Sequence, residues 1–244
     1  MRIVLNPKYQ HLREYLENIE EHFEKEGREL HHGRNVLRTL NVDGLPLVVK
    51  RYGRMPLSNR LATRIFFRSN KAKKAFVSPF LLKERGFDSP EPIGFVTVRE
   101  DWLNSTHYFV CLLSHCRYSM TDIPNLDPEF REEVTQAFAR YAAQLHKNGF
   151  LHHDFSAGNI LFDRVGDRIQ FVLIDTNSMK SGVAVSIEKG CQNFARLVGS
   201  SEFFDRLGTL YAERRGADPL RCIALIREAR EHYLARHKAA AEKS

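Results

Sequence analysis

The first half of the chain alternates apolar and polar residues in the way that β-strands do. Residues 36–42 alternate, the dipeptide Asp43-Gly44 is typical of a hairpin turn, and residues 45–52 return as a second strand. A further strand is predicted at residues 93–98, and residues 108–113 form a wholly apolar run. That last run is expected at the centre of a sheet, because a strand covered on both faces carries apolar side chains on both.

Apolar residues recur at helical spacing in four other places. Residues 8–26 carry one apolar stripe, and residues 72–85 form a second helical segment that Gly86 closes. Residues 127–149 carry a long buried stripe that ends in Lys-Asn-Gly, a composition typical of a helix C-terminus. Apolar residues between 194 and 226 predict at least two more helices.

Strands therefore come first and helices follow, which predicts an α+β fold with two lobes. We expect a small β-rich N-lobe at residues 1–113, a hinge or linker at 114–126, and a helical C-lobe at 127–244. A chain of 244 residues with 43% apolar content is long enough to bury such a core.

The net charge of +7 is compatible with anionic partners, such as nucleotide phosphates, acidic glycolipids, a membrane surface or nucleic acid. Charge alone is equally compatible with a solvated basic surface that has no partner. The densest positive stretch lies between Arg60 and Lys74. It could be a solvated helix face or a site for an anionic acceptor or lipid headgroup. The interleaved phenylalanines are more typical of a core than of base stacking, so no nucleic acid is expected. The stretch comprises Arg60, Arg64, Arg68, Lys71, Lys73 and Lys74.

The four cysteines form no C-x-x-C pair and have no histidine nearby at zinc-ligand spacing. They are expected to be reduced, mostly buried thiols. The first residues soon become charged, and no apolar run approaches the roughly 20 residues that span a bilayer. We therefore expect a cytoplasmic protein, with peripheral contact at the inner face of the membrane left open.

The most informative segment is His-His-Asp-Phe-Ser-Ala-Gly-Asn at residues 152–159. It holds Asp154 five residues before Asn159, and a strand–turn–strand pattern then leads to Asp175. A hairpin of this shape brings Asn159 and Asp175 to one end of a sheet, near the loop that carries Asp154. His152 is expected to pack and hydrogen-bond beneath the loop.

These side chains suit phosphoryl transfer from a nucleotide. Asp154 is the candidate catalytic base, which orients the attacking hydroxyl and accepts its proton. Asn159 and Asp175 offer the oxygen ligands that Mg²⁺ prefers. Each residue alone is common in turns, but the whole frame predicts a kinase-like phosphotransferase.

Three residues of the N-lobe are candidates for nucleotide binding. Lys50 ends the strand Leu-Val-Val-Lys and is the expected ligand of the α- and β-phosphates. Gly33 and Arg34 lie where a phosphate-covering loop would lie, although the segment lacks the G-x-G-x-x-G pattern. An ordinary hairpin turn is the equally weighted alternative at this position.

Taken together, these segments resemble the lipopolysaccharide kinase (Kdo/WaaP) family of the protein-kinase-like superfamily. The resemblance implies a bilobal kinase fold, the cofactors ATP and Mg²⁺, and transfer of the γ-phosphate to a sugar hydroxyl of the lipopolysaccharide inner core. It is carried by residues 33–35, 48–50, 71–76, 86–94, 152–162, 174–175 and 188–197.

Three departures from the kinase pattern qualify this expectation. His153 replaces the usual arginine, so control by a phosphorylated activation loop is not expected. Asp175 is followed by Thr-Asn with no later Ala-Pro-Glu, so a peptide-positioning segment is not expected either. The helix glutamate that normally pairs with the strand lysine falls at Val77 in the inferred register, whereas Glu84 is the alternative if the register differs by two turns. The remaining hypotheses are a nucleotide-binding pseudokinase and a protein kinase acting on tyrosine or serine.

Overall fold

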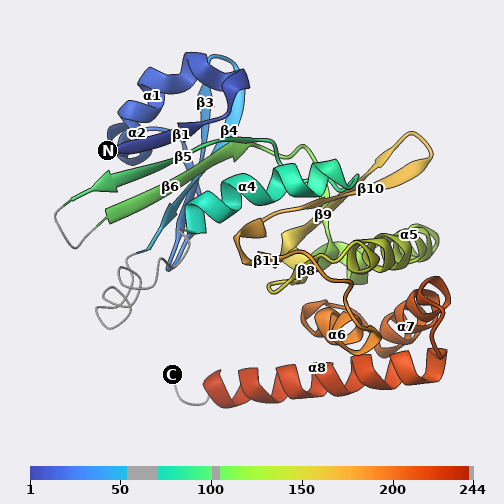
Figure 1. Cartoon of the computed structure of the whole chain (residues 1–244). Helices are drawn as coiled ribbons and strands as arrows, with labels where there is room; N and C mark the ends of the chain where they lie inside the picture. The colour runs from blue at the N-terminus through green and yellow to red at the C-terminus, as the bar shows by residue number, and fades with distance from the viewer. Residues whose placement is uncertain (54–70, 101–104, 242–244) are drawn as a thin grey trace. The chain divides into compact units, whose positions relative to one another are not determined.

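The computed structural model describes residues 1–53, 71–100 and 105–241 (Figure 1). The chain divides into two compact units, Met1–His115 and Cys116–Ser244. The first is built on an antiparallel β-sheet and the second is largely helical, so the predicted α+β class is confirmed. Within the described ranges, no helix combines the length and apolar composition that crossing a bilayer requires.

The first unit contains a six-stranded sheet in which all neighbours are antiparallel, in the order β1-β5-β6-β4-β3-β2. The apolar run that we expected at the centre lies in β6, between β5 and β4. The strands are β1 (Arg2–Leu5), β2 (Arg28–His32), β3 (Val36–Val42), β4 (Leu45–Tyr52), β5 (Pro92–Arg99) and β6 (Ser105–Leu112).

Both faces of this sheet are covered, because successive side chains of a strand point to opposite faces. Along β6, Tyr108 and Val110 pack into one core cluster with the N-terminal helices, and Phe109 packs into another with Ala72 of α4. Both helical segments flank the sheet in Figure 1. The helices of this unit are η1 (Pro7–Leu12), α1 (Arg13–Glu17), α2 (Ile19–Lys25) and α4 (Lys71–Glu84).

The single helix predicted for residues 8–26 is wrong, since three short helices stand there. The backbone leaves helical geometry at Tyr9 (φ −115°, ψ 31°) and again at Asn18 (φ −107°, ψ 21°). The apolar stripe itself is nevertheless buried, because each short helix keeps its apolar residues towards the sheet. Four of its members, Leu12, Leu16, Ile19 and Phe23, are at most 1% exposed.

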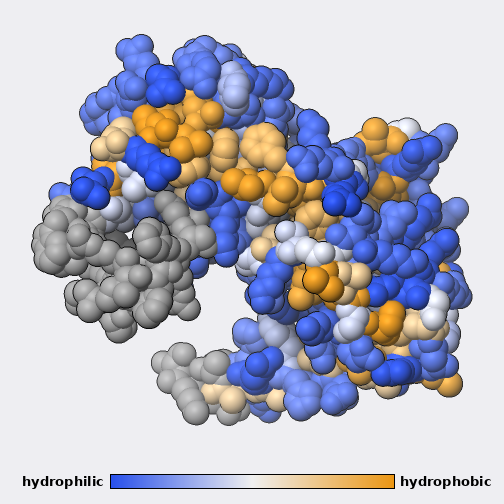
Figure 2. Space-filling view, in the orientation of Figure 1, coloured by the Kyte–Doolittle hydropathy of each residue, from blue (hydrophilic) through white to orange (hydrophobic). Residues whose placement is uncertain are grey.

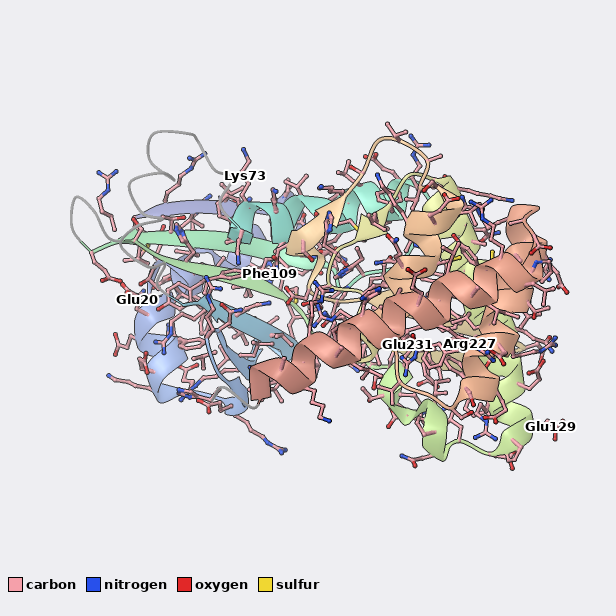
Figure 3. All side chains as sticks on the ribbon, turned by 90° about the horizontal axis from the view of Figure 1, so that it is seen from below. Glu20, Lys73, Phe109, Glu129, Arg227 and Glu231 are labelled. Atoms are coloured by element: carbon pink, nitrogen blue, oxygen red, sulfur yellow. The ribbon has the colours of Figure 1, made fainter. Side chains whose placement is uncertain are left out.

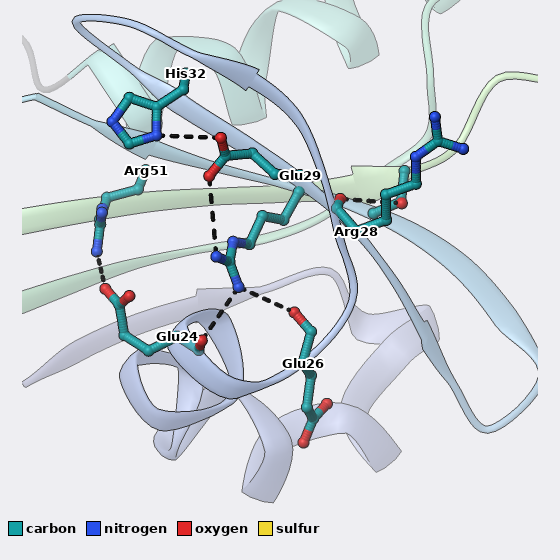
Figure 4. Close-up of polar contacts among 8 residues, drawn as sticks. Glu24, Glu26, Arg28, Glu29, His32 and Arg51 are labelled. Carbon is teal, nitrogen blue, oxygen red and sulfur yellow. Dashed lines mark hydrogen bonds and ion pairs between the residues drawn. The ribbon is translucent and has the colours of Figure 1, made fainter.

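Polar contacts attach α2 to the strands beside the sheet edge (Figure 4). Arg38 of β3 donates to the backbone oxygens of Glu24 and Glu26 at 3.2 and 3.3 Å. Arg51 of β4 forms an ion pair with Glu24. These contacts fix the helix against two strands that support the β2–β3 turn.

Helix α4 buries one narrow face against the sheet. Ala72, Ala75, Pro79 and Leu82 are buried, at the spacing of a helical stripe. The helix is followed by Gly86 (φ +77°), as the sequence predicts. Its outer side leaves apolar side chains exposed, and Figure 2 shows an apolar area over this region.

The second unit begins with a strand and a short helix and is then organised around α5. Two small sheets, with strand orders β10-β9-β7 and β11-β8, lie beside the helices. The strands are β7 (Tyr118–Ser119), β8 (Leu151–His152), β9 (Ile160–Val165), β10 (Arg168–Leu173) and β11 (Met179–Lys180). The helices are η2 (Met120–Asn125), α5 (Pro128–Lys147), η3 (Ala157–Asn159), η4 (Thr176–Ser178), α6 (Ile187–Gln192), η5 (Asn193–Arg196), α7 (Ser201–Arg215) and α8 (Pro219–Ala241).

Helix α5 starts and stops where its sequence requires. The Asp127 side chain caps the first turn, accepting from the backbone N–H of Glu129 at 2.9 Å, and Pro128 occupies the first helical position. The helix gives way to Asn148 and to Gly149, whose φ is +79°. The apolar side of α5 thereby faces the core of the unit.

Four phenylalanines from distant parts of the chain meet in that core. Phe138 of α5 has ring-centroid distances of 5.9 Å to Phe155, 5.5 Å to Phe171 and 6.0 Å to Phe194. Phe155 belongs to the segment 152–159, Phe171 to β10 and Phe194 to η5. The core therefore holds the candidate catalytic loop against the main helix.

Candidate active site

His152 forms the support of the loop at residues 152–159. Its side chain is fully buried, with Nε2 3.1 Å from the backbone oxygen of Ile174 and Nδ1 3.1 Å from the backbone nitrogen of Asp154. Because a carbonyl oxygen only accepts, Nε2 carries the proton and Nδ1 accepts the amide of Asp154. Burial lowers the pKa of His152, which favours this neutral form. The structural role expected for His152 is confirmed.

Asp154 and Asn159 are joined within the loop. The side-chain amide of Asn159 donates to the backbone oxygen of Asp154 at 2.9 Å. This contact closes the loop across five residues and leaves the Asn159 side-chain oxygen available as an acceptor. Both side chains are partly exposed, as groups that meet a substrate must be.

Asp175 lies beside Asn159, at the end of the β9–β10 hairpin. The strands pair from Arg168↔Val165 to Leu173↔Ile160, and the backbone N–H of Ile174 then donates to the oxygen of Asn159 at 3.0 Å. Asp175 adopts the left-handed conformation (φ 54°, ψ 42°), which non-glycine residues adopt rarely and Asp more readily than most. The hairpin expected to bring Asn159 and Asp175 together is present, and its turn consists of Gly166 and Asp167.

Arg196 contacts the Asp154 carboxylate, and the sequence did not indicate this contact. The two side chains form an ion pair between Nη1 and Oδ1, without the alignment of a regular hydrogen bond. They are 39% and 37% exposed, respectively. Arg196 ends the short helix η5, forty-two positions after Asp154 in the chain.

A buried chain of hydrogen bonds connects the same helix to the interior. Asn193 donates to the backbone oxygen of His152 at 2.9 Å, so its side-chain oxygen is left to accept from His146 Nε2, 3.2 Å away. The other ring nitrogen of His146 then accepts from the Tyr211 hydroxyl at 2.8 Å, and Arg215 donates to that hydroxyl oxygen. Burial lowers the pKa of His146 to about 4, so the ring is neutral as this directional chain requires.

Lys50 lies on β4 in the first unit and is only 8% exposed. Its Nζ is 5.3 Å from the centroid of the Tyr52 ring, and its positive charge acts on the Cys111 thiol across the sheet. Burial nevertheless dominates at that cysteine and raises its pKa to about 12. A lysine held at this depth has limited conformational freedom, which suits a defined ligand.

Gly33 and Arg34 form the exposed turn between β2 and β3. The turn is tied to the end of β4, where the backbone N–H of Gly53 donates to the Asn35 side chain at 3.2 Å. The approach is close: a Cβ at Gly53 would lie 1.9 Å from the backbone oxygen of Arg34. Gly33 and Arg34 therefore stand in a tight, exposed turn held against the end of β4.

Two positions of α4, Val77 and Glu84, were considered for the glutamate that normally pairs with the strand lysine. Neither lies on the face that packs against the sheet. Val77 is 39% exposed and Glu84 is exposed, whereas the buried face carries alanine, proline and leucine. We therefore assign no residue of α4 as the partner of the strand lysine.

The basic stretch noted in the sequence is only partly described. Arg60, Arg64 and Arg68 lie outside the described residues. Lys71, Lys73 and Lys74 are exposed on the first turns of α4. Lys73, labelled in Figure 3, lines a cavity of about 400 Å³ together with Arg2 and Arg99.

The oxygen donors fit a magnesium ion, by their chemistry. The amide nitrogen of Asn159 donates to the backbone of Asp154, and its side-chain oxygen is available to a metal ion. Asp175 adds a carboxylate oxygen, and it directly follows Ile174, whose backbone N–H donates to Asn159. Mg²⁺ bound with substrate phosphates requires only one or two protein carboxylates. The described residues contain no cluster of three or more His, Cys, Asp or Glu, so a closed metal cage of that kind is not part of the described site.

Comparison with protein-family models matches residues 81–207, slightly more than half of the chain, to the lipopolysaccharide kinase (Kdo/WaaP) family. The chain belongs to this family. Membership implies a kinase and the use of ATP. The match includes the loop at 152–159, Asp175 and Arg196.

Solved structures agree on the fold. Among 1117 matching chains is a structure described as "WaaP in complex with acyl carrier protein". It has a TM-score of 0.62 and 17% sequence identity, and the match covers 96% of this chain and 100% of that one. At that identity the likeness shows the kinase fold alone. Comparison with curated proteins found no significant match.

Sequence reasoning missed the part of the site that lies beyond Asp175. Asn193 and Arg196 stand in a segment that carries the family resemblance, but no role followed from their spacing. The available signal was a polar Asn-x-x-Arg pair on either side of Phe194 and Ala195, of which Phe194 is buried.

Proposed function

We propose that this kinase transfers the γ-phosphate of ATP to a sugar hydroxyl of the lipopolysaccharide inner core. The observation that carries the proposal is the joined arrangement of Asp154, Asn159 and Asp175 in the second unit. Family membership supports a glycolipid acceptor over other alcohols.

In this mechanism Asp154 accepts a hydrogen bond from the acceptor hydroxyl and orients its oxygen towards the γ-phosphorus. The new oxygen–phosphorus bond forms as the bond from the γ-phosphorus to the bridging oxygen breaks, and ADP leaves. Asp154 takes the hydroxyl proton during the step and returns it to solvent. Because such transition states are loose, orientation contributes more than strong basicity.

Five residues are proposed to bind the nucleotide and its metal ion. Asn159 and Asp175 would hold Mg²⁺, which when bound neutralises charge on the phosphates. Lys50 would bind the α- and β-phosphates, and the turn at Gly33 and Arg34 would contact the phosphates through its backbone and guanidinium.

The segment after Asp175 favours a small acceptor over a protein. Residues 176–186 contain one short helical turn and the two-residue strand β11, which pairs with β8, and α6 then begins at Ile187. A segment this short leaves little chain for docking an extended peptide. Autophosphorylated peptides in mass spectra would instead favour the protein-kinase hypothesis.

The exposed lysines of α4 and the cavity beside Lys73 support an anionic acceptor, or peripheral contact with anionic lipid. Sedimentation of the full chain with vesicles containing anionic lipid tests the second possibility. Binding that persists at high salt concentration, or that is equal on neutral vesicles, would contradict an electrostatic contact.

The direct test incubates purified protein with ATP, Mg²⁺ and deacylated core oligosaccharide. Wild type should yield phosphorylated sugar, and Asp154→Asn should lose nearly all activity because the isosteric amide cannot take the proton. Asp167→Asn is the matched control, since Asp167 is exposed at the turn of the β9–β10 hairpin.

Full transfer by Asp154→Asn would remove the proposed base. If wild type shows no transfer, a thermal-shift titration with ATP and Mg²⁺ distinguishes a pseudokinase, which binds without turnover, from a chain that binds no nucleotide.

A further inference from the structure

The loop that carries Asp154, residues 152–159, contains no lysine or arginine. The residues between Asp154 and Asn159 are Phe, Ser, Ala and Gly. A base for phosphoryl transfer works beside a triphosphate, and two negative groups at close range repel each other unless a positive charge lies near. A cation beside Asp154 would add to the neutralisation that Mg²⁺ and Lys50 are proposed to supply to the phosphates, and it would have to come from another part of the chain.

The structure supplies one through Arg196, whose guanidinium contacts the Asp154 carboxylate. A guanidinium stays protonated and has several N–H groups in a fixed plane, so it can hold one carboxylate oxygen and leave the other for the acceptor hydroxyl. Both side chains remain partly exposed, so the pair is accessible to a substrate.

The backbone around Arg196 is held on both sides. Asn193, three residues earlier, donates to the backbone oxygen of His152 at 2.9 Å. The next residue, Leu197, accepts from Arg230 of α8 at 2.7 Å, and the guanidinium carbon of Arg196 lies 5.8 Å from the centroid of the Tyr233 ring. These contacts fix the backbone on both sides of Arg196, so its side chain has a defined position beside Asp154.

We propose that Arg196 is a positioning residue for phosphoryl transfer, which fixes the orientation of the Asp154 carboxylate and offsets its charge beside the nucleotide. This inference rests on the proposed function of Asp154. Arg196 acts through Asp154 and is not itself required to contact the acceptor.

Arg196→Ala tests the proposal, and Arg227→Ala is its matched control. Arg227 pairs with Asp205 on the outer side of the same unit, on α8 in Figure 3. We expect kcat to fall by about 10- to 100-fold in Arg196→Ala, because small misplacements of a catalytic group have effects of this size. The KM for ATP should change by less, and Arg227→Ala should retain wild-type kcat.

Two further readouts separate positioning from a purely structural role. Methylguanidine added to Arg196→Ala should restore part of the lost kcat, whereas Arg227→Ala should not respond. In addition, Arg196→Ala should have no further effect in an Asp154→Asn background, because residues that act as a unit are not additive.

The proposal is overturned if Arg196→Ala retains or gains activity, which would mean that Arg196 is dispensable or blocks the base. It is also overturned if the effects of Arg196→Ala and Asp154→Asn on kcat multiply independently. The same holds if methylguanidine restores none of the lost kcat in a folded Arg196→Ala variant. Should wild type show no transfer at all, the proposed function fails separately, and hydrogen exchange still decides the positioning claim. Backbone amides at 154–159 should then exchange faster in Arg196→Ala than in Arg227→Ala, and equal rates would overturn it.

Discussion

The buried His146 predicts a specific loss of stability in mild acid. Its pKa is about 4 in the folded protein, against about 6.5 in an unfolded chain, because burial disfavours the charged ring. Between these two values the unfolded state binds more protons than the folded state. The free energy of unfolding therefore rises as pH increases from about 4 to about 6.5, and falls when pH is lowered through that window.

The size of this effect follows from the two pKa values. Going from pH 7 to pH 5 should lower the free energy of unfolding by about 2 kcal/mol through His146, and full protonation by about 3 kcal/mol. The buried His152 also has a lowered pKa and contributes with the same sign. A variant that cannot titrate is therefore needed to isolate His146.

His146→Gln provides that variant, because a glutamine amide stays neutral at both pH values. Urea denaturation at pH 5 and pH 7, with hydrogen exchange of α5 peptides as the probe, reports on the second unit. Wild type should lose about 2 kcal/mol more than His146→Gln over this interval. Equal losses in the two proteins would refute the assignment of a neutral, buried ring with a strongly lowered pKa.

Three further predictions concern other contacts. Gly53→Ala should destabilise the first unit by about 1–3 kcal/mol in thermal melts, because the new Cβ would meet a backbone oxygen at 1.9 Å, and a melting temperature equal to that of Gly33→Ala would contradict this. Gly33→Ala is the control because its Cβ would meet only the movable end of a histidine side chain. Tyr211→Phe should cost about 1–3 kcal/mol in urea denaturation, since it removes the donor to His146, and an unchanged midpoint would show that this bond is dispensable. Lys50→Met should weaken ATP binding at least tenfold by isothermal titration calorimetry, and unchanged affinity would remove Lys50 from the nucleotide site.

Strands and helices with a clear apolar pattern could be predicted from the sequence. The two strands at 36–42 and 45–52 and the long helix α5 stand where alternation, turn residues and caps indicated. Strand β2 was not predicted because all five of its residues are exposed, so it has no apolar face to reveal it. The two-residue strands β8 and β11 exist only through their pairing with each other, which no local pattern encodes.

The candidate site was predictable where the chain itself brings residues together. Asp154, Asn159 and Asp175 lie on one loop and one hairpin, so their proximity follows from local geometry. The contact of Arg196 with Asp154 depends on how η5 packs against the loop through Asn193 and the phenylalanine core. Such a long-range contact follows from tertiary packing, which residue spacing does not specify.

Asp154 is proposed to be the catalytic base of a kinase that acts on the lipopolysaccharide core. The most direct test of this claim is mass spectrometry of core oligosaccharide from cells that lack this protein, complemented with wild type or with Asp154→Asn at equal expression. We expect the core to lack one phosphate group without the protein, to regain it with wild type, and to remain without it with Asp154→Asn. An unchanged core in the deleted cells, or full restoration by Asp154→Asn, would contradict the claim.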